Sequence, residues 1–377
     1  MRIALLTYST RPRGGVVHTL HLAEALARAG HRVTVYSLAR GADAGFFREV
    51  DPAVTVRLAP FPDRPGESVT DRIVRSIATL REFVDAHGFD IVHAQDCISA
   101  NAVGRCIRTV HHLDDFTTPV LVECHEKALT TPYAHVCVSE AVAAEVRSGW
   151  GLAPTVIPNG VDHARFAEAA GPGSAAVADR ERWRRTLGPY VLAVGGIEPR
   201  KGSIDLLESF ALLRRRRPDL SLVFAGGETL FDYRDYRAHF DQRCDELGIQ
   251  PVVLGTVPEG ELPGLVAACD VFAFPSTKEG FGLAAMEALA AGRPVVARDL
   301  PILREVFGPC VDYAGSVPEL ADRLESALSA DPARADAGSA LAASLTWDAA
   351  AAAHLEFYAD HSGGHLGQPP PAQVNAD

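Results

Sequence analysis

The first forty residues alternate between apolar runs and helical spacing. Residues 2–8 (RIALLTY) form a continuous apolar run, which predicts a strand buried on both faces. Residues 16–29 place apolar side chains at helical intervals, and Gly30 ends that pattern. Residues 32–38 (RVTVYSL) predict a second strand. A strand, a glycine-containing turn, a helix and a second strand indicate parallel strands joined by a crossover.

The same alternation continues to about residue 160. It predicts further strands at 55–58, 90–94, 108–111, 134–139 and 155–158, and helices at 71–87, 98–106 and 140–148.

The pattern is interrupted after residue 162 and then starts again. Residues 167–180 (AEAAGPGSAAVADR) are small and contain Gly and Pro, so they predict a loop or linker. The second series predicts strands at 190–194, 221–225, 252–254, 271–275 and 294–297, with helices at 203–216, 237–247, 262–269 and 283–291. Residues 319–358 are Ala-rich and predict helix.

Two series of alternating strands and helices predict an α/β protein with two doubly wound parallel-sheet domains. We expect the first domain to span 1–162, a linker 163–189 and the second domain 190–345. A helix at 346–360, capped by Thr346, would cross back to the first domain, and 361–377 would be a disordered tail. Because ligands bind at the carboxyl ends of the strands in such sheets, we expect the site in the cleft between the domains.

Composition narrows the functional classes. The 377 residues include 36 Lys and Arg against 48 Asp and Glu, a formal charge of -12, which argues against nucleic-acid binding. We expect no signal peptide and no transmembrane helix, because no apolar segment has the required length. The seven cysteines contain no C-x-x-C pair, so neither a disulfide framework nor a zinc site is expected. These features indicate a cytoplasmic protein.

The richest candidate segment is 274–292 (FPSTKEGFGLAAMEALAAG). Glu279 lies on a loop after a predicted strand, Gly282 permits close backbone approach, and Leu283 begins a helix that contains Glu287. A helix N-terminus beside glycines favours an anion, whereas carboxylates favour hydroxyl groups. Together they suit a ligand with both phosphate and sugar hydroxyls. Alternatively, Glu287 is an ordinary acidic residue that complements the helix dipole.

Three weaker signals lie at other predicted strand ends. Arg200 and Lys201 in GGIEPRKG would place two cations at the cleft, although a solvated basic pair is the alternative interpretation. Gly14 and Gly15 precede the first helix and could expose backbone amides to a phosphate, but they do not form G-x-G-x-x-G. His111 ends a predicted strand and would point into the cleft.

These motifs together resemble the retaining glycosyltransferases of family 4. The resemblance covers about residues 1–358 and rests on E-x7-E (Glu279 to Glu287), R-K-G at 200–202, the Gly-Gly loop, DIVHA, VCVSEAV and VIPNGVD. It implies the GT-B architecture, in which two Rossmann-like domains face each other across a cleft. The first domain would then lie on the acceptor side, and the second would bind a nucleotide-sugar donor.

The resemblance also implies a role for each matching residue. Glu287 would hold ribose hydroxyls, Glu279 would contact the transferred sugar, and Arg200 and Lys201 would neutralise the diphosphate. His111, or His112 if the alignment shifts by one, would lie near the reacting sugar carbon. The implied catalytic residues are His111, Lys201 and Glu279; the implied donor-binding residues are Gly15, Arg200, Lys201, Glu279, Gly282, Leu283 and Glu287.

One position departs from the family pattern. The family commonly has an arginine on the diphosphate where this chain has Gly196. Either Arg200 takes over that contact, or Lys201 and the backbone hold the diphosphate alone.

The resemblance implies transfer of a sugar from a UDP- or GDP-sugar to a small-molecule, glycan or lipid acceptor, with retention of configuration. No D-x-D motif is present, so neither a metal nor another cofactor is expected. The alternatives are a nucleotide-sugar 2-epimerase of the same architecture, a dinucleotide-dependent oxidoreductase, and a binding module with a degenerate site. We expect residues 71–87 to pack as an ordinary helix rather than to contact a membrane, because acidic residues offset their arginines.

Overall fold

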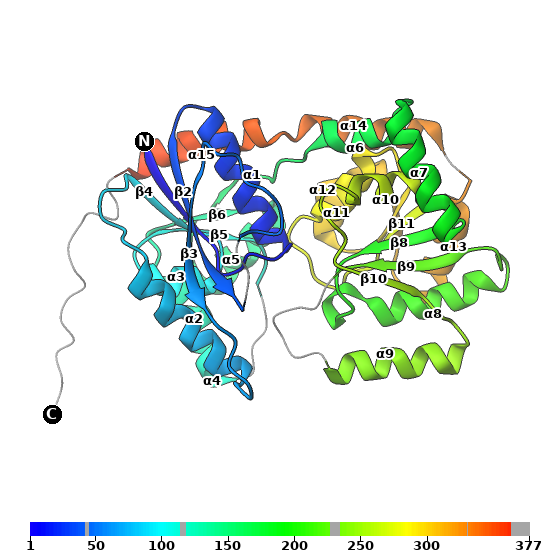
Figure 1. Cartoon of the computed structure of the whole chain (residues 1–377), viewed down its shortest axis with the longest axis horizontal. Coiled ribbons are helices and arrows are strands. Elements are labelled where there is room, and N and C mark those ends of the chain that lie inside the picture. Colours follow the sequence, from blue (N-terminus) through cyan, green and yellow to red (C-terminus); the bar gives the residue numbers. More distant parts are fainter. Residues whose placement is uncertain (42–44, 114–117, 227–233, 330, 363–377) are drawn as a thin grey trace.

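The computed structural model describes residues 1–41, 45–113, 118–226, 234–329 and 331–362. Two α/β domains lie side by side, and a pair of helices runs across the top of both in Figure 1. The expected fold class is confirmed: each domain contains one parallel sheet with helices on both faces.

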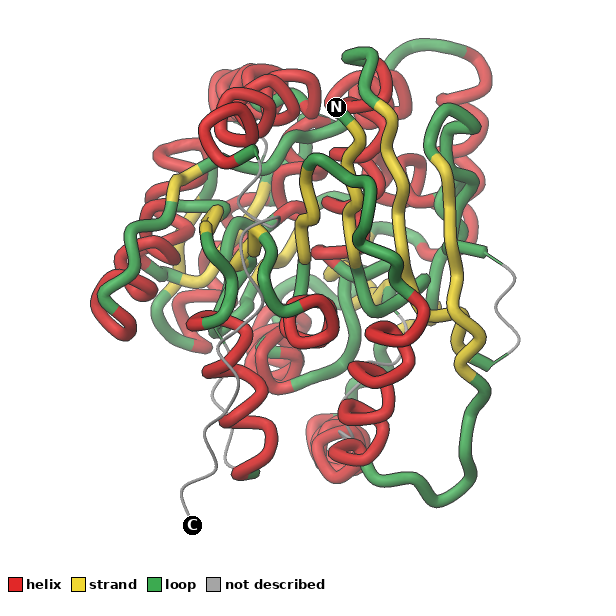
Figure 2. Tube along the Cα trace, turned by 90° about the vertical axis from the view of Figure 1, so that its left-hand side faces the viewer, coloured by secondary structure: helices red, strands yellow, loops and turns green. Residues whose placement is uncertain are grey.

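The first domain is built on a seven-stranded sheet in the order β3-β2-β1-β4-β5-β6-β7. Its strands are β1 (Arg2–Leu6), β2 (Arg32–Arg40), β3 (Thr55–Phe61), β4 (Ile91–Ala94), β5 (Ile107–Val110), β6 (Ala134–Cys137) and β7 (Thr155–Val156). Its helices are α1 (Gly14–Arg28), α2 (Val69–Phe83), α3 (Cys97–Val103), α4 (Pro119–Thr130) and α5 (Glu140–Trp150). Figure 2 looks onto this domain and shows its strands between helices.

The second domain contains a six-stranded sheet in the order β10-β9-β8-β11-β12-β13. Its strands are β8 (Tyr190–Val194), β9 (Ser221–Ala225), β10 (Val252–Gly255), β11 (Val271–Phe274), β12 (Val295–Arg298) and β13 (Asp312–Ala314). The helices that follow these strands are α8 (Ser203–Arg214), α9 (Arg234–Leu247), α10 (Leu262–Ala268), α11 (Leu283–Ala290), α12 (Pro301–Phe307) and α13 (Val317–Ala327).

Both sheets reverse their strand order beside their first strand. The reversal falls between β1 and β4 in one sheet and between β8 and β11 in the other. At such a reversal the two crossover connections leave in opposite directions and open a crevice at the carboxyl ends of the strands. The segments that follow β1, β4, β8 and β11 are therefore the ones positioned for ligand binding.

Residues 163–189 do not form the expected loop. They form α6 (His163–Ala170) and α7 (Ser174–Leu187), which pack against α10 and α11 of the second domain and bury Phe166 and Trp183. The loop prediction for 167–180 is wrong because Gly171, Pro172 and Gly173 interrupt helix only locally. The alanines and arginines on either side are strong helix formers.

The C-terminal helix α15 (Trp347–His361) crosses back onto the first domain, as expected. Its Trp347, Phe357 and Tyr358 are buried in the core that also contains β1 and α1. The hydroxyl of Tyr358 lies 2.7 Å from Nδ1 of His93 on β4. Thr346 caps the helix by accepting a hydrogen bond from the Ala349 amide at 3.0 Å.

The chain passes between the two domains twice, near residues 160–161 and near 345–347, and these two segments lie against each other. The amide of Val161 donates to the carbonyl of Leu345 at 2.7 Å. A Cβ at Gly160 would lie 2.4 Å from the backbone nitrogen of Trp347, so only glycine allows this approach. The Ala-rich region that leads into the second crossing contains α14 (Pro332–Ser344) as well as α13 and α15.

The predicted tail at 361–377 falls almost entirely outside the described residues. In the part of the chain that the structure describes, no helix is long and apolar enough to span a bilayer.

Candidate active site

His111 lies where the two domains meet. It follows the last residue of β5, and its ring lies against the first turn of α1: a Cβ at Gly15 would be 3.4 Å from Cδ2 of His111. From the second domain, Gly280 approaches so closely that a Cβ there would be 1.5 Å from the carbonyl oxygen of His111. The structure thus brings Gly15 and His111 together with the loop that carries Glu279.

The environment of His111 keeps its imidazole neutral. Burial, followed by the charges of His112 and Arg108, lowers the pKa of His111 to about 3. Its Nε2 lies 3.3 Å from the side-chain oxygen of Gln95, and the ring of His18 packs edge-on at 4.8 Å between centroids. A neutral imidazole can exchange hydrogen bonds with a substrate without adding a positive charge.

Glu279 is held by the two cations of the R-K-G motif. Its Oε1 accepts from Nζ of Lys201 at 2.5 Å and from Nη1 of Arg200 at 3.2 Å. Burial of Glu279 would raise the pKa of its carboxyl group, but Lys201 and Arg200 outweigh that effect and lower it to about 2. The structure therefore joins three predicted site residues into one partly buried ion-pair cluster.

Backbone at the ends of β8 and β9 makes room for this cluster. Gly195 has φ 141°, and a Cβ there would be 3.4 Å from Cε of Lys201, so the lysine stem crosses directly over the glycine. A Cβ at Gly226 would be 2.2 Å from the carbonyl carbon of Gly195. Although Gly196 lacks the family's arginine, Arg200 lies beside Lys201 on the same carboxylate.

The loop after β11 ends at a constrained glycine. Gly282 has φ 95°, and a Cβ there would be 2.8 Å from Cζ of Phe307. Both the left-handed backbone and the close ring require glycine. Leu283 then begins α11, whose first amides have no acceptor within the helix and are available to an anion.

Glu287 occupies a different electrostatic environment from Glu279. It is half-buried on α11, and burial raises the pKa of its carboxyl group to about 8. The nearby carboxylates of Glu259 and Asp162 raise this pKa further, while Arg165 opposes them. Sequence reasoning missed all three of these neighbours, because two of them belong to the segment around the expected linker and the third to a loop without a motif.

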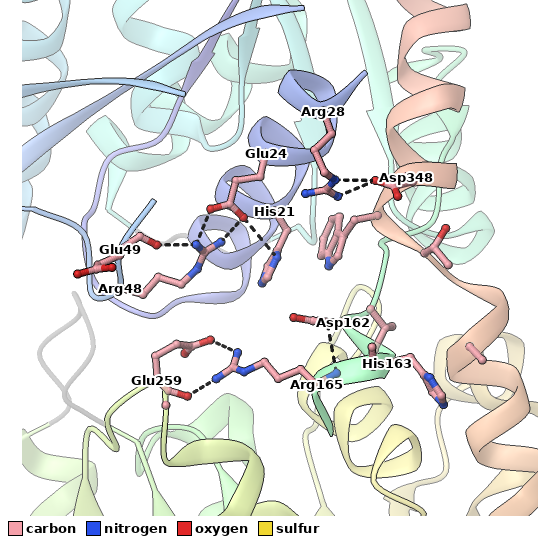
Figure 3. Close-up of a pocket in the computed structure, with 16 residues that line it drawn as sticks. His21, Glu24, Arg28, Arg48, Glu49, Asp162, His163, Arg165, Glu259 and Asp348 are labelled. Atoms are coloured by element: carbon pink, nitrogen blue, oxygen red, sulfur yellow. Dashed lines mark hydrogen bonds and ion pairs between the residues drawn. The ribbon is translucent and has the colours of Figure 1, made fainter. Parts of the chain in front are cut away.

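These three neighbours line an interdomain pocket of about 900 Å³ (Figure 3). One wall comes from α1 with His21, Glu24 and Arg28; others come from α6, the 259–260 loop and the start of α15. Its charged groups are largely paired. Arg48 donates to both oxygens of Glu24 at 2.6 and 2.8 Å, Arg165 contacts Glu259, and Arg28 contacts Asp348 at 2.6 Å.

The raised pKa of Glu287 predicts a pH effect on stability. The folded protein binds the proton of Glu287 more tightly than the unfolded chain does. As pH rises from about 4.5 to 8, the unfolded chain releases this proton while the folded protein still holds it, so the free energy of unfolding falls. We expect Glu287→Gln to flatten the decline of Tm across this range, measured by thermal unfolding without ligand. An equal decline in the variant and the wild type would contradict the assigned environment.

Among the described residues, no group of three or more His, Cys, Asp or Glu side chains is arranged to hold a metal ion.

Known proteins resemble this chain over most of its length. Residues 178–342 match the family model described as Glycosyl transferases group 1, and residues 12–165 match the model of Glycosyltransferase Family 4. The chain is 30% identical to the D-inositol 3-phosphate glycosyltransferase of Pseudarthrobacter chlorophenolicus, over 97% of each chain. It is 28% identical to the MMP alpha-(1->4)-mannosyltransferase of Mycolicibacterium hassiacum, over 87% of this chain and 88% of that protein.

Solved structures give the same architecture. Sucrose-phosphate synthase from Thermosynechococcus elongatus superposes with a TM-score of 0.77 at 21% identity, covering 95% of this chain and 98% of the other. Anabaena HepE in complex with UDP-glucose superposes with a TM-score of 0.71 at 20% identity, covering 96% and 100%.

The chain belongs to the group 1 glycosyltransferases of family 4, and its fold is GT-B. It is therefore a glycosyltransferase, and the oxidoreductase alternative is set aside.

Proposed function

We propose that this glycosyltransferase transfers a sugar from a nucleoside diphosphate sugar to an acceptor, with retention of configuration and without a metal ion. The observation that carries the proposal is the partly buried cluster of Lys201, Arg200 and Glu279, which lies on the loop and strand ends that meet His111.

The diphosphate of the donor would lie between Gly15, the first amides of α11 and the two cations. When the sugar leaves, negative charge builds on the diphosphate. Lys201 and Arg200, together with the helix N-terminus, stabilise that charge from fixed positions. In the structure, Glu279 accepts hydrogen bonds from both cations. Its remaining lone pairs would accept hydrogen bonds from hydroxyls of the transferred sugar.

Glu287 would hold the ribose of the nucleotide. With a pKa near 8, its carboxyl group is largely protonated at neutral pH, so it can donate one hydrogen bond and accept another. Both bonds suit a pair of vicinal hydroxyls, and a largely neutral group would not repel the adjacent diphosphate.

His111 would lie beside the reacting sugar carbon, and its contact with Gly15 favours it over His112 for this role. We assign no covalent nucleophile. Retention would follow if the acceptor attacks on the face from which the diphosphate departs, so that the leaving phosphate oxygen takes the acceptor's proton.

The names of similar proteins support a class of donor but do not agree on an acceptor. One structural neighbour is a complex with UDP-glucose, which supports a uridine nucleotide. The relatives differ in the acceptor that their names give, D-inositol 3-phosphate in one case and MMP in another, so kinship alone does not select an acceptor.

The test is a calorimetric titration with UDP, GDP and NAD, followed by product analysis with the nucleotide sugars that bind. We expect a nucleoside diphosphate to bind, NAD not to bind, and the product to keep the anomeric configuration of the donor, as read from its NMR coupling constant. An epimerised sugar formed without acceptor would instead identify a 2-epimerase.

A further inference from the structure

Two arginines of the first domain converge on the ring of Tyr8. The guanidinium carbon of Arg13 lies 5.9 Å from the ring centroid, and that of Arg40 lies 5.6 Å from it. Arg40 is also 5.5 Å from the ring of Phe61 at the end of β3. We call Tyr8, Arg13 and Arg40 the arginine cluster.

The arginine cluster contains hydrogen-bond donors with no acceptor. Nε of Arg13 and both Nε and Nη2 of Arg40 are buried and meet no hydrogen-bond acceptor within the described residues. Buried guanidinium donors are normally paired, because an unmet charged donor costs free energy. Because the side chains of Arg13 and Arg40 are otherwise half-buried, a ligand that reaches their exposed part is able to supply an acceptor.

A neighbouring arginine provides the contrast. Arg75 stacks on Phe61 at 3.7 Å, but its Nε and Nη2 donate to the two oxygens of Glu67 at 2.6 and 2.7 Å. Its charge is neutralised within the protein, as are those of the pocket in Figure 3. Within the described residues, neither Arg13 nor Arg40 has such a carboxylate partner.

The local charge is positive. Burial lowers the pKa of Arg40 to about 10; Tyr8 opposes this effect, and the guanidinium groups of Arg72, Arg13 and Arg11 add to it. The carboxylate of Asp96 accepts from the backbone amides of Tyr8 at 2.9 Å and Ser99 at 2.8 Å.

The arginine cluster also lies in the right place for a substrate. Arg40 ends β2 and Tyr8 follows β1, so both are at the carboxyl edge of the sheet that faces the other domain. Arg13 precedes α1 and stands two residues before Gly15, which contacts His111.

We propose that Arg13 and Arg40 bind a phosphate group of the sugar acceptor, so that the acceptor is a phosphomonoester rather than a neutral sugar or alcohol. This inference rests on the proposed function. Two planar guanidinium forks around one aromatic ring fit the several oxygens and double charge of a phosphomonoester.

The first test measures binding of inorganic phosphate to the full chain saturated with UDP, which occupies the donor's own phosphate site. We expect Arg40→Met and Arg13→Gln each to weaken phosphate binding by about tenfold or more. Arg40→Lys should weaken it less, because it keeps the charge and loses the fork. The matched control is Arg57→Met on the exposed face of β3, which should bind phosphate as the wild type does.

The second test compares acceptors as matched pairs in an assay of UDP release from the preferred donor. Glucose 6-phosphate is set against glucose, and myo-inositol phosphate against myo-inositol. We expect at least one phosphorylated member to accelerate release in the wild type, with a KM raised tenfold or more by Arg40→Met and kcat changed less.

Equal phosphate affinity in wild type and in all three cluster variants would overturn the inference, and so would acceleration by the neutral members alone. Failure of the proposed function is recognised separately, because then UDP itself would not bind to the wild type. The difference in phosphate affinity between wild type and Arg40→Met still tests the arginine cluster in that case.

Discussion

Replacing Lys201 by alanine is expected to lower kcat by about 10²–10³-fold while the affinity for UDP changes much less. Lys201 pairs with Glu279, and in the proposed function it would also meet the donor's diphosphate. As charge develops on the leaving diphosphate, the interaction with Nζ strengthens, so its loss is felt mainly in the transition state. Single-turnover measurement of nucleoside diphosphate release checks this expectation.

Two variants show whether the Lys201 effect is specific. Lys127→Ala removes an exposed lysine of α4 that pairs with Glu123 one turn away, and it should leave turnover unchanged. Lys201→Arg keeps the charge in a different geometry and should recover part of the rate. If Lys201→Ala kept the kcat of the wild type, the assigned leaving-group role would be lost.

Replacing Gly280 by alanine is expected to reduce turnover by about 10²-fold without unfolding either domain. The added methyl group would overlap the carbonyl oxygen of His111, which belongs to the other domain. A slightly larger separation of the two domains would relieve the clash. The expected defect is therefore in domain closure, which brings the acceptor close to the donor sugar. Donor binding, which depends on the second domain, should remain.

The control for Gly280→Ala is Gly149→Ala. Gly149 lies within α5, where a Cβ would meet nothing within 4 Å, so this variant should match or exceed the wild type in stability and match it in turnover. Thermal unfolding and UDP titration of both variants separate a folding defect from a closure defect. Normal turnover in folded Gly280→Ala would show that this contact is not needed for the reaction.

Most of the fold could be predicted because the strands are buried on both faces. The central residues Ile3, Ala4 and Leu5 are completely buried, as are Val191 and Leu192 in the second sheet. Such strands appear in the sequence as unbroken apolar runs, and the crossovers between them as helical spacing. The strand order, and with it the position where each sheet reverses, came only from the structure.

The elements that were missed have weaker patterns. Helix α4 buries only a few side chains, and α12 is only 7 residues long and begins at a proline. Helices α6 and α7 were mistaken for a loop because the break between them contains two glycines and a proline. For α4 and α12, tertiary contacts stabilise a helix that the local sequence only weakly favours, whereas α6 and α7 consist of strong helix formers on either side of a local break.

For the candidate site, too, the sequence indicated some features and only the structure showed the others. Sequence spacing singled out the loop with Glu279 and the helix start at Gly282, because they follow a predicted strand. It left Arg200 and Lys201 open between cleft cations and a solvated basic pair, and only the family resemblance gave them a role. It could not show that Lys201 and Arg200 both bind Glu279, since these residues are 78 and 79 positions apart.

By itself, the sequence determined the two α/β domains, the edge of each sheet that carries the chemistry, and the residue types present there. The tertiary structure decided the ionisation of those residues: Glu279 has a pKa near 2 and Glu287 one near 8, although they are the same amino acid eight positions apart. It also decided that Arg75 pairs with Glu67, whereas buried nitrogens of Arg13 and Arg40 have no hydrogen-bond partner in the part of the chain that the structure describes. The physical reason is that burial and charge partners set a pKa, and these partners come from distant segments and from the opposite domain.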